Sequence, residues 1–298
     1  MHILTQDETS IYIDNNILSW WRQCQKKAYY QATLGLSLGD TNPALYFGSK
    51  WHEAMAVLWG SSSDTDIWNI EKTLTVLEDY SPRLEDPVKG RTRERMENAL
   101  REYHEYVNEA SGENYRDTAL AASTLMAEEF IKHPIMDYKG KTVYYCGVVD
   151  RVFALDERIL ILDYKTTTWN RITDNTWNKN PQFMGYLWLL NKVAPSLYTN
   201  HFILDLFMLQ AKTNNRFVRR YLEYEDWQLS QWEADRKSEI IELLSSTHQS
   251  HRPNCDDYGG CIFNTLCDQP EECLEGLKQF YLIEPWNMHG NTPITKGV

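Results

Sequence analysis

The middle of the chain contains two consecutive segments whose composition is typical of β-strands. Residues Lys141–Leu155 are rich in Val, Tyr and Phe, and residues 158–164 form a short apolar run. β-Branched and aromatic residues favour strands, and the Asp156-Glu157 pair between the segments predicts a turn. The sequence therefore predicts a β-hairpin, which also fixes the residues that face one another across the two strands.

The predicted pairing brings two carboxylates and an amine together. If Leu155 lies opposite Arg158, counting back along the hairpin places Asp150 opposite Asp163. Like charges in this arrangement are destabilising unless something compensates them, and a divalent cation would do so. Lys165 projects from the same face as Asp163. This group suits metal-assisted phosphodiester hydrolysis. The alternative is that Asp150 pairs with Arg151 or another surface cation and that Asp163-Tyr164-Lys165 is merely a polar strand end.

The segments around the hairpin predict a mixed sheet covered by helices, an α/β (α+β) fold. Asn180 before Pro181 predicts a helix start, because Asn caps helices well and Pro is tolerated in the first helical position. Helices are expected at residues 17–34, 48–59, 90–108, 116–132, 181–192 and 226–247, and further strands at 201–210 and 216–224.

The composition excludes some classes of function. The chain has 298 residues, a formal net charge of -12 and an aromatic content of 13%. An acidic excess excludes a general basic surface, so any nucleic-acid contact must be local and sensitive to salt. The sequence has no apolar run long enough for a membrane span and no signal-peptide pattern at its start, so a cytoplasmic location and no membrane partner are expected.

Four motifs in order carry a resemblance: Gly48–His52, Gly147–Asp150, Asp163-Tyr164-Lys165 and Gln182–Tyr186. Together they resemble the PD-(D/E)XK nuclease superfamily, specifically its RecB-type branch. The resemblance implies a restriction-endonuclease-like fold and a Mn²⁺ or Mg²⁺ site. The expected metal ligands are His52, Asp150, Asp163 and the backbone carbonyl of Tyr164, and the expected catalytic residues are Asp150, Asp163 and Lys165. An imidazole ligand favours Mn²⁺ relative to Mg²⁺. Gln182 and Tyr186 are expected to steer DNA from one helix face.

The cysteines suggest a second cofactor. Cys255, Cys261 and Cys267 are evenly spaced in one loop, with wider gaps than structural zinc sites usually have. The sequence is also similar to RecB-type nucleases with an iron–sulfur cluster, including CRISPR-associated exonucleases and their phage relatives. That resemblance implies a 4Fe–4S cluster held by these three residues and Cys24. Cys273 is the rival ligand. A zinc ion and free thiols are the alternatives.

The polar loop after Lys165 is a candidate DNA contact. It carries Trp169, Arg171, Trp177 and Lys179. Aromatic rings that stack on bases favour single strands. The alternative is that the tryptophans only pin the loop by packing.

We expect one nuclease domain over residues 1–283. It would comprise a helical part (1–135), a catalytic core (136–250, with the helix at 45–60) and an iron–sulfur cap (251–283, with Cys24), followed by a flexible tail (284–298). The expected function is metal-dependent DNA exonuclease activity on single strands or DNA ends. An endonuclease or end-processing subunit of a recombination or CRISPR-adaptation complex, with a protein partner, is one alternative. A non-catalytic iron–sulfur DNA-binding module is the other.

Overall fold

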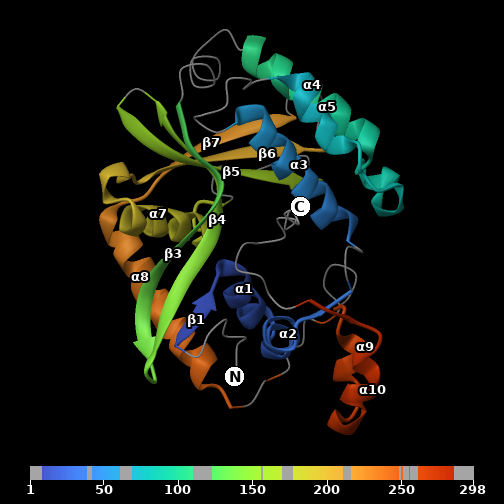
Figure 1. Ribbon diagram of the computed structural model, residues 1–298, viewed down its shortest axis with the longest axis vertical. Coiled ribbons are helices and arrows are strands. Elements are labelled where there is room, and N and C mark those ends of the chain that lie inside the picture. The colour runs from blue at the N-terminus through green and yellow to red at the C-terminus, as the bar shows by residue number, and fades with distance from the viewer. Residues whose placement is uncertain are drawn as a thin grey trace, which may run out of the picture. The chain divides into compact units, whose positions relative to one another are not determined.

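The computed structural model describes residues 9–38, 42–60, 69–109, 123–155, 157–169, 177–210, 216–247, 250, 255 and 261–284. The chain divides into two compact units, each assembled from separate stretches. The first unit takes in Met1–Gly39, Phe130–Gly147 and Trp227–Val298, and the second takes in Asp40–Glu129 and Val148–Asp226. Two long strands, β3 (Ser123–Tyr138) and β4 (Lys141–Leu155), contribute to both units (Figure 1).

The second unit contains a mixed sheet. The second half of β4 is antiparallel to β5 (Arg158–Thr167), β5 is parallel to β6 (His201–Met208), and β6 is antiparallel to β7 (Phe217–Glu223). The predicted hairpin register is confirmed, because Leu155 pairs with Arg158 and Arg151 pairs with Leu162. The strands predicted over 201–210 and 216–224 correspond to β6 and β7.

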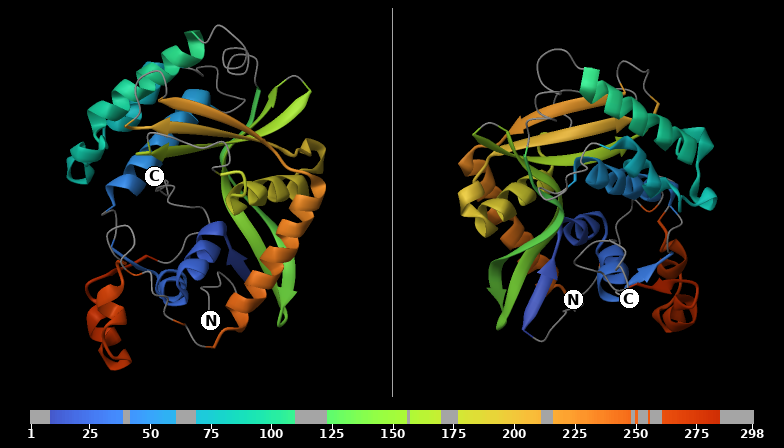
Figure 2. Two further views of the ribbon diagram at one scale, coloured as in Figure 1. Left: turned by 180° about the vertical axis from the view of Figure 1, so that it is seen from behind. Right: turned by 45° about the horizontal axis from the view of Figure 1, so that its top comes forward.

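Helices cover both faces of this sheet (Figure 2). On one face, α3 (Pro43–Trp59), α4 (Ile70–Leu74) and α5 (Arg93–Glu109) form a core with the sheet, in which Trp51 stacks on Phe207 at 4.7 Å between ring centroids. On the other face, α7 (Pro181–Val193) stacks Phe183 on Phe202 at 4.4 Å. Short 3₁₀ turns lie at Thr75–Leu77, Pro82–Leu84, Pro87–Lys89 and Pro195–Leu197.

Capping explains where these helices begin. The Asn180 side chain accepts a hydrogen bond from the Gln182 amide, and Pro181 is the first residue of α7, as predicted. Asn42 and Pro43 start α3 in the same way. A mixed sheet with helices on both faces confirms the α/β fold that was expected from the sequence.

The first unit is built around the other half of the long strands. β1 (Ser10–Ile13) is parallel to β4, pairing Ser10 with Thr142 and Ile13 with Tyr145. α8 (Asp226–Ser245) belongs to this unit from Trp227 onward, and its Trp232 packs edge-on against Tyr145. The unit also contains α9 (Asn264–Cys267), a 3₁₀ turn (Glu271–Cys273), α10 (Leu274–Lys278) and a small antiparallel pair, β2 (Leu36–Ser37) with β8 (Leu282–Ile283).

One long predicted helix is interrupted. Residues 17–34 were predicted to be continuous, but α1 (Asn15–Gln23) ends at Cys24, where the backbone is extended with φ -165°. α2 (Gln25–Ala28) then starts from Cys24 and passes into a π-helical turn, Tyr29–Thr33. The sequence pattern contains no Gly or Pro to mark the break, because Cys24 takes an extended conformation that any residue can adopt.

A second predicted helix is wrong. Residues 116–132 were expected to be helical, whereas Ser123–Tyr138 form β3, which pairs with β4. Ala, Leu, Met and Glu in this stretch favour helices, but pairing along a neighbouring strand overrides that weak preference. The part of the prediction that precedes Ser123 lies outside the described residues.

Among the helices of the described ranges, none is long and apolar enough to cross a bilayer. The predicted tail after Glu284 lies outside the described residues. Glu284 itself donates its amide to the carbonyl of Gly35 at 2.7 Å.

Candidate metal centre

Asp150 is fixed at the point where the β4–β5 ladder stops. The last backbone pair recorded is Arg151 with Leu162, and beyond it the Asp150 Oδ2 atom accepts the Tyr164 amide at 2.8 Å. The Asp150 side chain is 6% exposed. A carboxylate thus replaces the carbonyl that would continue the ladder, which holds its second oxygen in a defined place.

His52 contacts this carboxylate from helix α3. Its Nδ1 atom lies 3.2 Å from Asp150 Oδ2, and its ring meets the Tyr164 ring edge-on at 6.0 Å between centroids. Burial disfavours the imidazolium, but the charge of Asp150 and the contacts of the ring with the Asp150 and Glu128 carboxylates outweigh it, and the pKa of His52 is raised to about 10. In the metal-free protein, His52 is therefore a cation at neutral pH.

Glu128 joins the group although nothing in its sequence pattern singled it out. Its Oε1 atom lies 3.8 Å from His52 Nδ1, and burial raises the pKa of its carboxyl. Ligand atoms of His52, Glu128 and Asp150 lie within 4.8 Å of one another, a set that could hold a metal ion. Sequence reasoning missed Glu128 because it lies in the segment that was predicted to be helical, and it has no motif of its own.

Asp163 and Lys165 form a buried ion pair on β5. Lys165 Nζ lies 2.7 Å from Asp163 Oδ2 and 2.9 Å from Oδ1, and the Asp163 side chain is 1% exposed. Burial raises the pKa of Asp163 to about 6, with Lys165 lowering and Asp150 raising it. Burial opposes the Lys165 cation, yet Asp163 and Asp150 raise its pKa overall. Asp163, predicted as a metal ligand, is thus held by Lys165 rather than grouped with His52, Glu128 and Asp150 in this structure.

Arg151 does not pair with Asp150. Successive residues of a strand point to opposite faces, and the Arg151 guanidinium lies 3.9 Å from the Trp59 ring centroid, with Nε donating to Thr124 Oγ1 at 3.0 Å. The alternative pairing of Asp150 with Arg151 is therefore wrong, and Asp150 contacts His52 and the Tyr164 amide instead.

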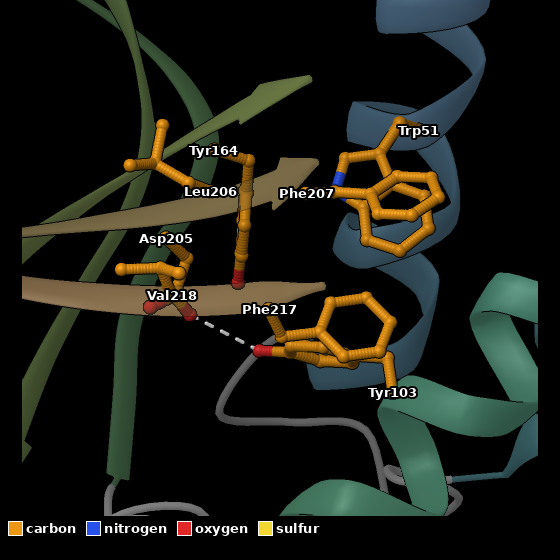
Figure 3. A pocket seen from close by; sticks show the side chains of 8 residues that line it. All are labelled: Trp51, Tyr103, Tyr164, Asp205, Leu206, Phe207, Phe217 and Val218. Carbon is orange, nitrogen blue, oxygen red and sulfur yellow. Dashed lines mark hydrogen bonds between the residues drawn. The ribbon is translucent and has the colours of Figure 1, made fainter. Parts of the chain in front are cut away.

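The Tyr164 side chain lies on the opposite face of the sheet from Asp163 and Lys165, where its ring meets the His52 ring. It lines a small cavity together with Trp51 of α3, Tyr103 of α5 and residues of β6 and β7 (Figure 3). Asp205 lies in the same cavity wall and accepts the Tyr103 hydroxyl. The middle residue of Asp163-Tyr164-Lys165 therefore anchors β5 in the core, while a ligand role for its backbone carbonyl stays a prediction.

The residues predicted to contact DNA are differently placed. Gln182 Nε2 donates to the Tyr186 hydroxyl at 2.9 Å, so these two side chains do share a face of α7. Trp177 stacks on Phe183 and lies 6.2 Å from Trp169, which is 53% exposed. Lys179 is exposed, and Arg171 lies outside the described residues. Trp177 therefore packs on the sheet-covering helix, and Trp169 is the ring open to solvent.

The four cysteines predicted for the cluster belong to the first unit. Cys24 separates α1 from α2, Cys267 ends α9, and the Cys261 amide donates to the Cys255 carbonyl at 2.7 Å. Burial raises the pKa of Cys267, and the charges of Cys24 and Cys261 raise it further. Among the described residues, the only group of ligand atoms close enough to share one metal ion is His52, Glu128 and Asp150, so no cysteine site of that kind is formed. The rival ligand Cys273 is exposed, and Cys146 is buried in the first unit.

The fold and site define a mixed α/β protein that presents a histidine–carboxylate group beside a buried Asp–Lys pair. A family model described as the PD-(D/E)XK nuclease superfamily matches residues 18–268, and the chain belongs to that superfamily. No curated protein matches the chain.

Solved structures also match the chain, two of them over most of its length. One is the crystal structure of SSO0001, at 14% identity and a TM-score of 0.38, covering 89% of this chain and 88% of that one. The other is a candidate exonuclease from Eubacterium rectale, at 12% identity and a TM-score of 0.47, covering 82% of this chain and 86% of that one.

Proposed function

We propose that this protein is a divalent-metal-dependent DNA exonuclease that acts on single strands or DNA ends. The observation that carries the proposal is the convergence of His52, Glu128 and Asp150 next to the Asp163–Lys165 pair within one unit of a PD-(D/E)XK nuclease. Family membership supports the nuclease class, and the choice of substrate rests on the resemblance to RecB-type exonucleases.

The donor set suits Mg²⁺ or Mn²⁺. Carboxylate oxygens are the ligands both ions prefer, and the His52 nitrogen favours Mn²⁺ relative to Mg²⁺. A bound cation would supply positive charge for the phosphate oxygens and lower the pKa of the attacking water. Asp150 and His52 would hold the ion, and Asp163 would join them once Lys165 turns towards the substrate.

Lys165 supplies the second charge. Its pKa is raised, so its amine carries a proton at neutral pH and can donate hydrogen bonds to a phosphate oxygen or to the water. Its side chain is 23% exposed, which leaves room for a substrate atom to approach. Asp163 holds the amine in position until the phosphate arrives.

The strand path would follow the start of α7. The Asn180 cap already accepts the Gln182 amide, so the contacts would come from the Gln182 and Tyr186 side chains, which lie one turn apart on one face of the helix. The exposed Trp169 ring can stack on a base. Because the formal net charge is -12, phosphates would be bound by a few local cations, and binding through those contacts is expected to weaken as salt rises.

End-labelled and circular DNA test this proposal. Linear single and double strands, labelled at either end, and circular single strands are incubated with Mg²⁺ or Mn²⁺. Asp163→Asn and Lys165→Ala should lower the rate by at least about 10²-fold, whereas the exposed Lys89→Ala should not change it. Degradation that survives both site variants overturns the assignment. Cutting of the circle would favour the endonuclease alternative, and DNA binding without metal-dependent cutting would favour the non-catalytic module.

We propose, secondly, that Cys24, Cys255, Cys261 and Cys267 hold a 4Fe–4S cluster. Support comes from the resemblance and from the position of Cys24 and Cys261, which both lie near enough to Cys267 to raise its pKa. Each thiolate of such a cluster binds a different iron, so the sulfurs need not approach as closely as around one shared ion.

Visible absorbance of anaerobically purified protein tests the cluster. Cys24→Ser should remove a broad iron–sulfur band, and Cys273→Ser should leave it. Loss of the band in Cys273→Ser, with Cys24→Ser unchanged, would move the fourth ligand to Cys273. A colourless wild-type protein that contains zinc by elemental analysis would overturn the cluster.

A further inference from the structure

We propose that Glu128 is a third protein ligand of the metal, so that the ion can bind before Asp163 leaves Lys165. This inference rests on the proposed function and deepens it, because it adds to the site a residue that the motifs do not contain.

The first observation is the state of the neighbouring carboxylates. Asp150 Oδ2 already accepts the Tyr164 amide and faces His52, and both oxygens of Asp163 lie within 2.9 Å of Lys165 Nζ. Glu128 is the carboxylate of the group that no lysine or backbone amide holds among the described hydrogen bonds. The Glu128 carboxylate could therefore bind a metal at His52 and Asp150 without first breaking a hydrogen bond to a lysine or a backbone amide.

The second observation concerns the Glu128 Oε1 atom. It is buried and has no hydrogen-bond donor in the described structure, and His52 Nδ1, at 3.8 Å, lies beyond hydrogen-bond distance. A buried carboxylate oxygen without a hydrogen-bond donor is unfavourable, and the His52 imidazolium at 3.8 Å is too far away to donate to it. The atom lies within 4.8 Å of ligand atoms of both His52 and Asp150, where one cation could reach all three.

The third observation is the backbone. Glu128 has φ +47° inside β3, in the left-handed region where glycine is the favoured residue. A Glu side chain at such a position costs stability and persists at sites where the side chain has a use. Glycine would relieve the backbone and remove the ligand, so one substitution can separate folding from metal binding.

Substitutions at Glu128 and its neighbour test the proposal. Glu128→Gly and Glu128→Gln are compared with Glu129→Gln, which neutralises an adjacent, exposed carboxylate of the same strand. Mn²⁺ affinity is measured by calorimetry, and urea unfolding of the metal-free proteins gives their stability. Both Glu128 variants should bind Mn²⁺ at least about tenfold more weakly, whereas Glu129→Gln should match the wild type. Glu128→Gly should unfold at the same or a higher urea concentration than the wild type.

Two results would overturn the proposal. One is wild-type Mn²⁺ affinity in both Glu128 variants. The other is an affinity loss confined to Glu128→Gly together with easier unfolding, since that pattern would mean a backbone role. Asp150→Asn keeps the failures distinguishable: if it loses Mn²⁺ binding while the Glu128 variants keep it, only this inference fails, whereas a wild type that binds no metal removes the proposed function itself.

Discussion

Buried charges occupy both faces of the strands that carry the site, and the two groups are compensated in different ways. Tyr164 pairs with Asp205 and Asp163 pairs with Leu204, so Asp205 and Asp163 lie on opposite faces. On the Asp205 face, Arg219 binds the carboxylate through two nitrogens at 2.6 and 2.5 Å, and Tyr103 adds its hydroxyl at 3.1 Å. That face carries a fork-to-fork ion pair, the strong geometry for Arg and Asp.

The face that carries Asp150 and Asp163 has no such one-to-one ion pair with an arginine among the described residues. Three carboxylates, Glu128, Asp150 and Asp163, share one lysine and one histidine, and their pKa values move in different directions. Burial raises the pKa of Asp163 and of Glu128, whereas for Asp150 the effects of His52, Lys165 and the Tyr164 amide together outweigh burial and lower the pKa. Burial alone therefore does not identify a carboxylate that binds a metal, because buried carboxylates lie on both faces. The group proposed to bind the metal is the one in which three carboxylates share only two cationic side chains, so that a further cation can be bound.

The largest expected difference between the two faces is in stability. Asp205→Ala removes the carboxylate that both Arg219 nitrogens bind, and should lower the free energy of unfolding by about 3–5 kcal/mol. Asp163→Asn should not lower it, because burial raises the pKa of Asp163 and an amide avoids that cost. Urea unfolding of the metal-free variants measures both. Equal losses would mean that Asp163, like Asp205, is mainly a structural ion-pair partner.

The second prediction concerns pH and metal affinity. His52 has a pKa of about 10 in the metal-free protein, so at neutral pH a metal must displace its proton before it can bind the imidazole. Affinity should therefore rise with pH, by up to about tenfold per pH unit below that pKa. Asp163, with a pKa of about 6, is already ionised above neutral pH and adds nothing to this slope.

Calorimetry in buffers of different ionisation enthalpy checks the slope, because it counts the protons released on binding. About one proton should leave per Mn²⁺ at pH 7.5 in the wild type. His52→Ala should bind more weakly and release fewer protons. A pH-independent affinity in the wild type would show that His52 is neutral in the free protein or is not a ligand.

The sequence could predict the β4–β5 hairpin and its register because apolar strands with a two-residue turn allow few pairings. That register alone places Asp150 near Asp163, and the Asn180-Pro181 pair marks the start of α7. Glu128 could not be found in this way. Its segment has the composition of a helix, and it becomes a strand only by pairing with β4, an interaction between distant residues that local preference does not contain.

The same limit applies to the Asp163–Lys165 pair. The order of the motifs predicts that both residues belong to the site, but which group Asp163 binds in the metal-free protein depends on the surrounding charges. Two residues apart on one strand face, they can contact directly, and burial strengthens the attraction between their charges. The two-residue spacing of Asp163 and Lys165 shows that they can form an ion pair. Which carboxylates can bind a metal depends on the positions of His52 and Glu128, which the spacing does not give.

The smallest effect on stability is expected for Tyr103, which bonds Asp205 and lines the same cavity as Tyr164. Tyr103→Phe removes one hydroxyl that Asp205 accepts while Arg219 still binds both carboxylate oxygens, and should lower the free energy of unfolding by about 1 kcal/mol. Mn²⁺ affinity should not change, because Tyr103 contacts neither His52, Glu128 nor Asp150 among the described interactions. Tyr103 and Tyr164 nevertheless line one cavity, and the Tyr164 amide holds Asp150. A change in Mn²⁺ affinity that exceeds the change in stability would therefore show that the core face tunes the site through Tyr164, and that the two groups of charges are not independent.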